Sequence, residues 1–204
     1  ISNITQYFSA WGVVYGSILM LFTILYMLTI LLMEKKDKEI YKGLSDTDAL
    51  TGLFNRRAFQ AAVDETLLKR ISGVFIFIDV DNFKDYNDKY GHANGDLCLK
   101  HFAAAMKKCF PKDSILGRYG GDEFVVYIKN AASDDAHRYM DEFQREISHL
   151  MMSGGEYVTV SASAGGVAFI GEGEDFVSLC RSADNMLYDV KRNGKGTFKM
   201  KGAK

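Results

Sequence analysis

The stretch Ile115–Ile128 reads ILGRYGGDEFVVYI and contains the clearest structural signal in this chain. Two segments suited to strands, Ile115–Tyr119 and Glu123–Ile128, flank the glycine pair Gly120-Gly121. Runs of this kind on either side of a glycine turn are typical of a β-hairpin. We therefore predict two antiparallel strands here, with acidic residues directly after the tightest point of the turn.

An unbroken apolar run, Val74–Ile78, ends on Asp79 and suits a central strand. If this strand lies beside the hairpin, the carboxylates of Asp79, Asp122 and Glu123 converge. Converging carboxylates repel one another and raise the pKa of at least one, so a divalent cation is the natural resolution. Mg²⁺ fits, because it binds a few carboxylate or carbonyl oxygens and completes its shell with water and phosphates. Since consecutive strand side chains point to opposite faces, we favour Asp122 over Glu123 as the direct ligand.

The acidic pair beside two glycines has a plainer interpretation as a polarised, exposed turn, which would be the better one for this motif alone. Around it, the soluble part alternates between helix-like and strand-like segments, and Asn55 can cap the first helix. The order lacks strict strand–helix alternation, which favours an α+β fold over a doubly wound α/β fold. We expect helices over 56–70, 96–110, 133–152 and 175–192, strands over 74–79, 157–169 and 197–200, and a loop or short helical turn over 81–95.

The N-terminal segment differs in kind. Residues 1–33 contain no Asp, Glu, Lys or Arg, and from Val13 onward they are almost wholly apolar. This run exceeds the roughly 18 to 20 residues needed to cross a hydrocarbon core. The alternative, a buried core helix, would normally show one polar stripe. We predict a transmembrane helix over 1–33, a linker or signalling helix over 34–44 and a catalytic domain over 45–204.

The flanks of the apolar run indicate its orientation. Aromatic side chains suited to a membrane interface lie near one end, and Lys35, Lys36 and Lys38 follow the other, which favours a cytoplasmic catalytic domain. The spacing of Met33, Ile40 and Leu44 leaves a coiled coil and a solvated linker helix equally open. The missing initiator methionine suggests a fragment.

Charge and cysteine content exclude some functions. The 25 basic and 26 acidic residues nearly cancel, so we expect no nonspecific nucleic-acid binding. The cysteines, Cys98, Cys109 and Cys180, form no CxxC pair and have no zinc-site spacing. Buried, reduced thiols in a cytosolic setting fit them best.

Four ordered motifs resemble the GGDEF family of diguanylate cyclases: DALTGLFNRR at 48–57, FKDYND at 83–88, GHANGD at 91–96 and RYGGDEF at 118–124. The resemblance extends over Ser45–Met200. It implies a palm, ferredoxin-like central antiparallel sheet with flanking helices, related to nucleotide cyclases, with the hairpin next to the central strand. The implied activity joins two GTP molecules into cyclic di-GMP and pyrophosphate.

The resemblance also implies roles for particular residues. Asp79, the Val80 carbonyl and Asp122 would hold Mg²⁺, with Mn²⁺ as an alternative, and Glu123 would lie close by as a second catalytic and metal-binding carboxylate. Guanine would be read by Asn87 and Asp96, whose amide and carboxylate groups match the donors and acceptors of that base.

The remaining implied contacts surround the substrate. His92 would line the guanine pocket. The basic residues expected to contact GTP are Lys84, Arg118, Lys191 and Lys195. The family often has Arg where Lys195 stands, so a point charge is kept but bidentate geometry is lost.

Because each domain of this family holds one GTP, a homodimer is implied, tethered to the cytoplasmic membrane of a bacterium. Many family members bind product at an Arg-x-x-Asp motif upstream of the hairpin, where this chain has PKDS at Pro111–Ser114. We expect no product inhibition through that site. The alternatives are a catalytically silent module that binds GTP or cyclic di-GMP, and a membrane sensor whose cytosolic domain is a dimerisation scaffold.

Overall fold

A computed structural model describes residues 2–151, 155 and 157–201, without the side chains of 2–10, 34–44 and 150–151. The chain divides into two units, Ile1–Ser45 and Asp46–Lys204. Each unit is described by itself.

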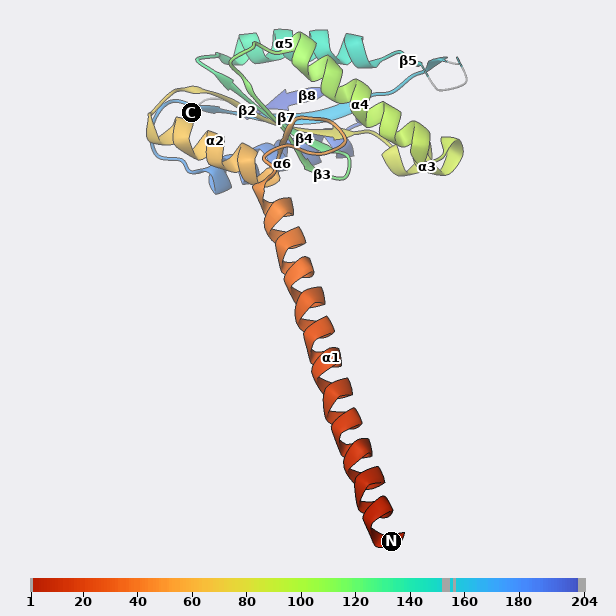
Figure 1. Ribbon diagram of the computed structural model, residues 1–204. Helices are drawn as coiled ribbons and strands as arrows, with labels where there is room; N and C mark the ends of the chain where they lie inside the picture. Colours follow the sequence, from red (N-terminus) through yellow and green to blue (C-terminus); the bar gives the residue numbers. More distant parts are fainter. Residues whose placement is uncertain (1, 152–154, 156, 202–204) are drawn as a thin grey trace. The chain divides into compact units, whose positions relative to one another are not determined.

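The first unit is one helix, α1 (Ser2–Leu44), drawn from red to orange in Figure 1. Its segment Trp11–Met33 is 23 residues long, has a mean hydropathy of 2.3, and is long and apolar enough to cross a membrane by length and composition. The hydroxyls of Ser17, Thr23 and Thr29 donate to backbone carbonyls three or four residues earlier, so they stay satisfied without water. The helix continues through position 34, where we expected the linker to begin. The proposed heptad extends into side chains outside the described residues.

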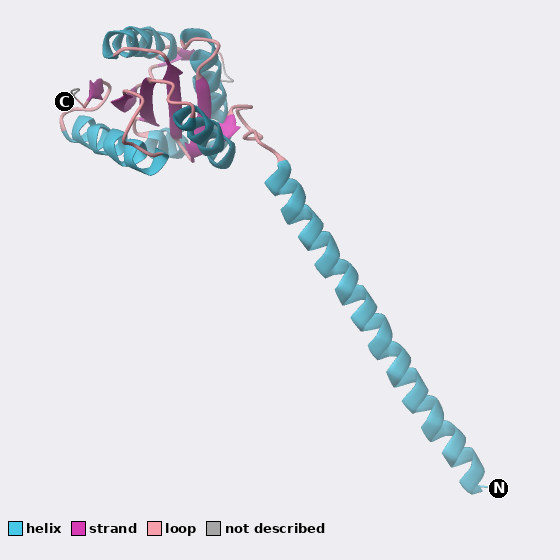
Figure 2. Ribbon diagram, turned by 90° about the vertical axis from the view of Figure 1, so that its left-hand side faces the viewer, coloured by secondary structure: helices cyan, strands magenta, loops and turns pink. Residues whose placement is uncertain are grey.

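The second unit is built on a six-stranded sheet flanked by helices (Figures 1 and 2), which confirms the expected α+β class. The strand order is β1-β3-β4-β2-β7-β8, with antiparallel pairing except for the parallel edge pairs β1–β3 and β7–β8. A second sheet pairs β5 with β6. The strands are β1 (Phe54–Asn55), β2 (Gly73–Val80), β3 (Ile115–Gly120), β4 (Glu123–Lys129), β5 (Leu150–Met151), β6 (Tyr157–Val158), β7 (Ala162–Phe169) and β8 (Phe198–Met200). The helices are α2 (Arg56–Leu68), α3 (Phe83–Tyr90), α4 (His92–Cys109), α5 (Ser133–Ile147) and α6 (Phe176–Arg192).

Strand β2 lies at the centre of the domain and is buried on both faces, as its unbroken apolar run predicts. Val74, Ile76 and Ile78 pack into the core formed with α4 and α5. The alternate residues Phe75 and Phe77 pack into the core formed with α2 and α6. Because side chains alternate along a strand, Asp79 at the end of β2 falls on the α2 and α6 face.

The predicted elements differ from the observed ones in three places. The segment 81–95, expected as a loop or short helical turn, contains the helix α3, and α4 begins at His92 instead of position 96, because Gly91 at φ +80° turns the chain between the two helices. The helix expected over 133–152 ends at Ile147, and the chain then forms β5. The strand expected over 157–169 is interrupted before β7, where the Ser161 carbonyl accepts from the Asp81 N–H.

Candidate functional site

The hairpin of β3 and β4 lies directly beside the end of β2, as the sequence predicts. Asp79 pairs in register with Glu123, and the Val80 N–H donates to the Asp122 carbonyl at 3.2 Å. These two contacts join the end of the central strand to the turn that carries the acidic pair. Asp79 is only 8% exposed, so its charge must be compensated locally.

The register also decides which carboxylates share a face. Glu123 stands opposite Asp79 in the β2–β4 ladder, so the two side chains lie on the same side of the sheet. Asp122 belongs to the turn that precedes β4. Strand alternation therefore places Glu123 with Asp79, and our preference for Asp122 as the direct metal ligand stays a prediction.

The charges at this edge are coupled. Burial raises the pKa of Asp79, the Lys191 ammonium at 2.8 Å opposes this, and the charges of Asp122 and Asp81 raise it further, so the pKa lies above its usual value. Burial also raises the pKa of Glu123, and the charges of Asp79 and Asp122 add to the shift. The expected repulsion between these carboxylates is therefore present.

The donor set suits a hard divalent cation. The carboxylates of Asp79, Asp122 and Glu123 and the Val80 carbonyl are the oxygen ligands that Mg²⁺ prefers. Lys191 supplies one positive charge to Asp79, so part of the compensation comes from the chain itself. Over the described residues, no three His, Cys, Asp or Glu side chains are gathered closely enough to form a ready-made metal cage. That is compatible with Mg²⁺, which usually keeps several waters and binds substrate phosphates.

The predicted guanine-reading residues lie on α3 and α4, which pack against each other. Among the residues that the structure describes, the buried Oδ1 atom of Asn87 has no hydrogen-bond partner, which is uncommon for a buried polar atom. A Cβ at position 95 would overlap the Asn87 amide, so Gly95 lets this side chain lie against α4. Asp96 follows on the same helix and is exposed. The structure thus places Asn87 and Asp96 on two helices that pack against each other, and the unsatisfied acceptor belongs to Asn87.

The other residues predicted to contact GTP lie on α3 and α4 and near the end of β2. His92 is the exposed first residue of α4, and Lys84 is exposed on α3. Lys195 donates from Nζ to the Asn82 side chain at 2.8 Å and has φ +62°. Together with Lys191, it lies near the end of β2.

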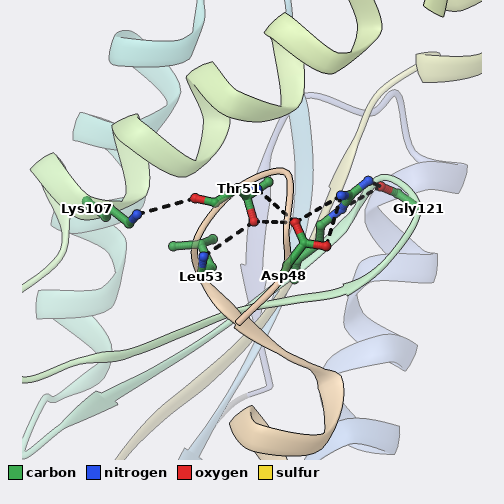
Figure 3. A network of polar contacts seen from close by, with 6 residues as sticks. Asp48, Thr51, Leu53, Lys107 and Gly121 are labelled. Carbon is green, nitrogen blue, oxygen red and sulfur yellow. Dashed lines mark hydrogen bonds and ion pairs between the residues drawn. The ribbon is translucent and has the colours of Figure 1, made fainter. Parts of the chain in front are cut away.

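The side chain of Arg118 forms hydrogen bonds inside the domain. Two of its partners, Asp48 and Gly121, are labelled in Figure 3. Its Nη1 atom donates to both carboxylate oxygens of Asp48, at 3.1 and 3.2 Å. Its Nε and Nη2 atoms donate to the Gly121 carbonyl, at 3.1 and 2.7 Å. Asp48 also accepts from the N–H and hydroxyl of Thr51, and Lys107 donates to the Thr51 carbonyl. Arg118 therefore braces the hairpin turn, and its contact with GTP stays a prediction.

Sequence reasoning missed the role of Asp81. This carboxylate is 8% exposed and accepts from the hydroxyls of Ser161 and Ser163 and from the Gly196 N–H. Its partners lie 80 or more residues away along the chain. The sequence signal for this role was the position of Asp81 two residues after Asp79. A second signal was the spacing of Ser161 and Ser163, two residues apart directly before and inside β7.

The cysteines match their expected burial in part. Cys98 and Cys109 are buried and Cys180 is half-buried, and all three are free thiols. Burial raises the pKa of Cys98 to about 12 and that of Cys109 to about 11. These two thiols therefore stay protonated and behave as small core residues.

Comparison with known proteins identifies the family of the second unit. The family model "Diguanylate cyclase, GGDEF domain" matches residues 45–197. A protein named diguanylate cyclase from Vibrio cholerae is 33% identical over 164 residues, covering 78% of this chain and 50% of that protein. The Escherichia coli protein named cyclic di-GMP phosphodiesterase PdeR is 33% identical over 168 residues, covering 81% of this chain and 25% of that protein. The chain therefore spans between a quarter and a half of these two relatives.

A solved structure of the GGDEF domain of TpbB (YfiN) from Pseudomonas aeruginosa matches with a TM-score of 0.71. It is 30% identical and covers 76% of this chain and 93% of that one. The similarity thus extends through the second unit of the chain.

Proposed function

The chain belongs to the GGDEF domain family of diguanylate cyclases, and we propose that it condenses two molecules of GTP into cyclic di-GMP and pyrophosphate. The observation that carries the proposal is the edge formed by Asp79, Asp122 and Glu123, with Lys191 paired to the first of them. An enzyme that transfers nucleotidyl groups needs this combination of hard oxygen ligands and fixed positive charge.

In the proposed reaction, the ribose 3′-hydroxyl of one GTP attacks the α-phosphorus of the other, and pyrophosphate leaves in line. Bound Mg²⁺ would neutralise phosphate charge and lower the pKa of the attacking hydroxyl. Asp79, the Val80 carbonyl and Asp122 would hold the ion, with Glu123 beside them. Asp122 is also our candidate acceptor for the hydroxyl proton, because it lies in the turn rather than inside a strand.

Recognition of the base would fall to the α3–α4 pair. The buried, unpartnered Oδ1 of Asn87 supports this proposal, because a bound base could supply the missing donor. Asp96 would accept from the guanine amide edge, which adenine lacks, so GTP should be preferred over ATP. Lys84, Lys191 and Lys195 would contact the triphosphate, and His92 the rim of the base pocket. Arg118 would reach substrate only by releasing its internal partners.

The cyclisation joins two nucleotides, so two domains, each with one GTP, must meet as a homodimer. We propose that α1 anchors each copy in the membrane, since Trp11–Met33 has the length and composition required. The catalytic domains would then lie in the cytoplasm of a bacterium.

The direct test uses the full chain in lipid nanodiscs, incubated with GTP and Mg²⁺, followed by chromatography of the nucleotides. We expect cyclic di-GMP and pyrophosphate from the wild type, with ATP a poor substrate and EDTA abolishing turnover. Cross-linking in the same nanodiscs reports whether two copies are present. If dimeric wild type formed no cyclic di-GMP, the enzyme proposal would be wrong.

The second candidate is a silent module that binds GTP or cyclic di-GMP and signals by contact. Its support is the similarity to a protein named as a phosphodiesterase, which places a domain of this kind in a differently named enzyme. The acidic residues Asp79, Asp122 and Glu123 are all present here, which favours the cyclase. Nucleotide binding without product in the nanodisc assay would select the silent module instead.

A further inference from the structure

The carboxylate of Asp81 forms a hydrogen-bonded cluster outside the proposed metal site. Its Oδ1 atom accepts from the Ser163 hydroxyl at 2.6 Å. Its Oδ2 atom accepts from the Ser161 hydroxyl at 2.7 Å and from the Gly196 N–H at 3.0 Å. Both oxygens are thus occupied by donors of the chain. This distinguishes Asp81 from Asp79, whose partner is an ammonium group.

The cluster ties down an unusual turn. Gly194, Lys195 and Gly196 follow α6 and all have positive φ, at +119°, +62° and +64°. A lysine in the left-handed region is strained and persists only when its surroundings enforce this conformation. The turn is held to the segment after β2 at two adjacent points. The Gly196 N–H binds Asp81, and the Lys195 ammonium binds the neighbouring Asn82.

These contacts connect the two chain segments that would surround the triphosphate of GTP. On one side, Asp81 directly follows Val80, whose carbonyl is a proposed metal ligand. On the other, the turn follows α6, which carries Lys191, and itself carries Lys195. Asp81 belongs to the first segment and is hydrogen-bonded to the second. It therefore sets the distance between the proposed metal ligands and the Lys195 ammonium.

We propose that Asp81 is a positioning residue, which clamps the 193–196 turn against the end of β2 and thereby aims Lys195 at the triphosphate. It acts through hydrogen-bond geometry and binds no metal, because a metal would have to displace donors from both of its oxygens. The substrate part of this inference rests on the proposed function, whereas the clamp itself does not.

The clamp makes different predictions for two substitutions. Asp81→Asn keeps it, because the amide oxygen can accept from Gly196 and Ser161 while the NH₂ group donates to Ser163. Asp81→Ala removes every one of these contacts. A metal ligand would respond in the opposite way, since an amide is a poor replacement for a carboxylate on Mg²⁺.

The experiment compares the wild type with both variants as full chains in nanodiscs. For Asp81→Ala, we expect the KM for GTP to rise about tenfold with kcat changed less than about threefold, as for the loss of one charged contact in binding. Asp81→Asn should stay within about threefold of wild type in both parameters and in the Mg²⁺ concentration for half-maximal activity. Adding Lys195→Ala to Asp81→Ala should raise KM little further, because both act through one group.

Hydrogen exchange provides a readout that needs no turnover. The segment 193–197 should be protected in the wild type and in Asp81→Asn, and should exchange faster in Asp81→Ala. If Asp81→Ala does not fold, the wild type and Asp81→Asn still decide the matter. Fast exchange of this segment in the wild type, or a raised Mg²⁺ requirement in Asp81→Asn, would overturn the proposal. A wild type that makes no cyclic di-GMP defeats the proposed function but leaves the exchange test intact.

Discussion

The two ends of the candidate site are built in opposite ways. At the carboxylate edge, Asp79 is paired with Lys191 and lies in register with Glu123, and the hairpin turn is hydrogen-bonded to Val80. At the α3–α4 pair, the Asn87 acceptor is buried and has no hydrogen-bond partner within the described part of the chain. The chain itself compensates part of the charge at the first end, whereas the second end has an unfilled hydrogen-bonding position.

This difference follows from the tasks that we propose for the two ends. Charge development in phosphoryl transfer is stabilised best by groups that are already fixed, and a sheet register fixes them. Discrimination between bases depends instead on polar atoms that only the correct base can satisfy. Substitutions at the first end should therefore change turnover, and substitutions at the second should change affinity and base preference.

The largest effect is expected at the carboxylate edge. Asp79→Asn or Asp122→Asn should lower kcat by about 100-fold or more, because each removes a proposed ligand of the catalytic cation. Binding of a GTP analogue should fall much less. Asp113→Asn is the matched control, since Asp113 is exposed and lies outside the carboxylate edge. Turnover of either variant within threefold of wild type would contradict the assignment.

At the other end, Asn87→Ala should raise the KM for GTP by about 10- to 100-fold and narrow the preference for GTP over ATP. The physical reason is the loss of the Asn87 amide, which we propose pairs with the base. Steady-state assays with both nucleotides measure this, and Asp88→Asn, an exposed change on the same helix, serves as control. An unchanged preference for GTP over ATP would show that Asn87 does not recognise the base.

A smaller effect should show whether Arg118 stabilises the hairpin turn. Arg118→Ala removes hydrogen bonds to Asp48 and to the Gly121 carbonyl, and should lower the free energy of unfolding by about 1 to 3 kcal/mol. Arg57→Ala is the control, because its ion pair with Asp46 is exposed and should contribute about 0 to 1 kcal/mol. Thermal melts followed by circular dichroism compare them. Equal melting temperatures would show that the Arg118 network does not stabilise the turn.

The smallest effect concerns pH and has opposite signs at two carboxylates. The pKa of Glu123 is raised, so the folded state binds more protons and stability falls as pH rises through the window above the ordinary carboxyl pKa of about 4.3. Asp48 is the reverse case. Partial burial raises its pKa, but hydrogen bonds from Thr51 and Arg118 lower it below the usual value. Its stabilisation is complete above pH about 3.9 and is lost as pH falls through the lowered folded pKa.

In EDTA at neutral pH, Glu123→Gln should therefore raise the melting temperature by a few degrees, and Asp48→Asn should lower it. Both differences should shrink in acid, as each carboxylate becomes protonated in the folded state as well. Melts at a series of pH values test this pair. A destabilised Glu123→Gln variant under these conditions would show that the three carboxylates do not repel one another.

Much of the domain could be predicted from local sequence. The hairpin, the buried central strand and its end on Asp79 follow from apolar runs and turn residues, and they appear as expected. The cap by Asn55 also appears, with its side chain accepting from the Ala58 N–H. The helix α3 was expected only as a loop or short helical turn, because FKDYNDKY is mostly polar and contains no buried residue that would show a periodic pattern.

The residue pattern within each segment, and the order of the segments, therefore predicted the fold class and the approximate position of each carboxylate. The faces and long-range contacts came from the tertiary structure alone: Glu123 shares a face with Asp79, Arg118 pairs with Asp48, and Asp81 accepts from the Gly196 N–H in the turn before β8. The reason is physical. Strand alternation assigns faces only once the pairing register is known, and hydrogen bonds between residues 70 to 115 positions apart leave no periodic trace in the sequence.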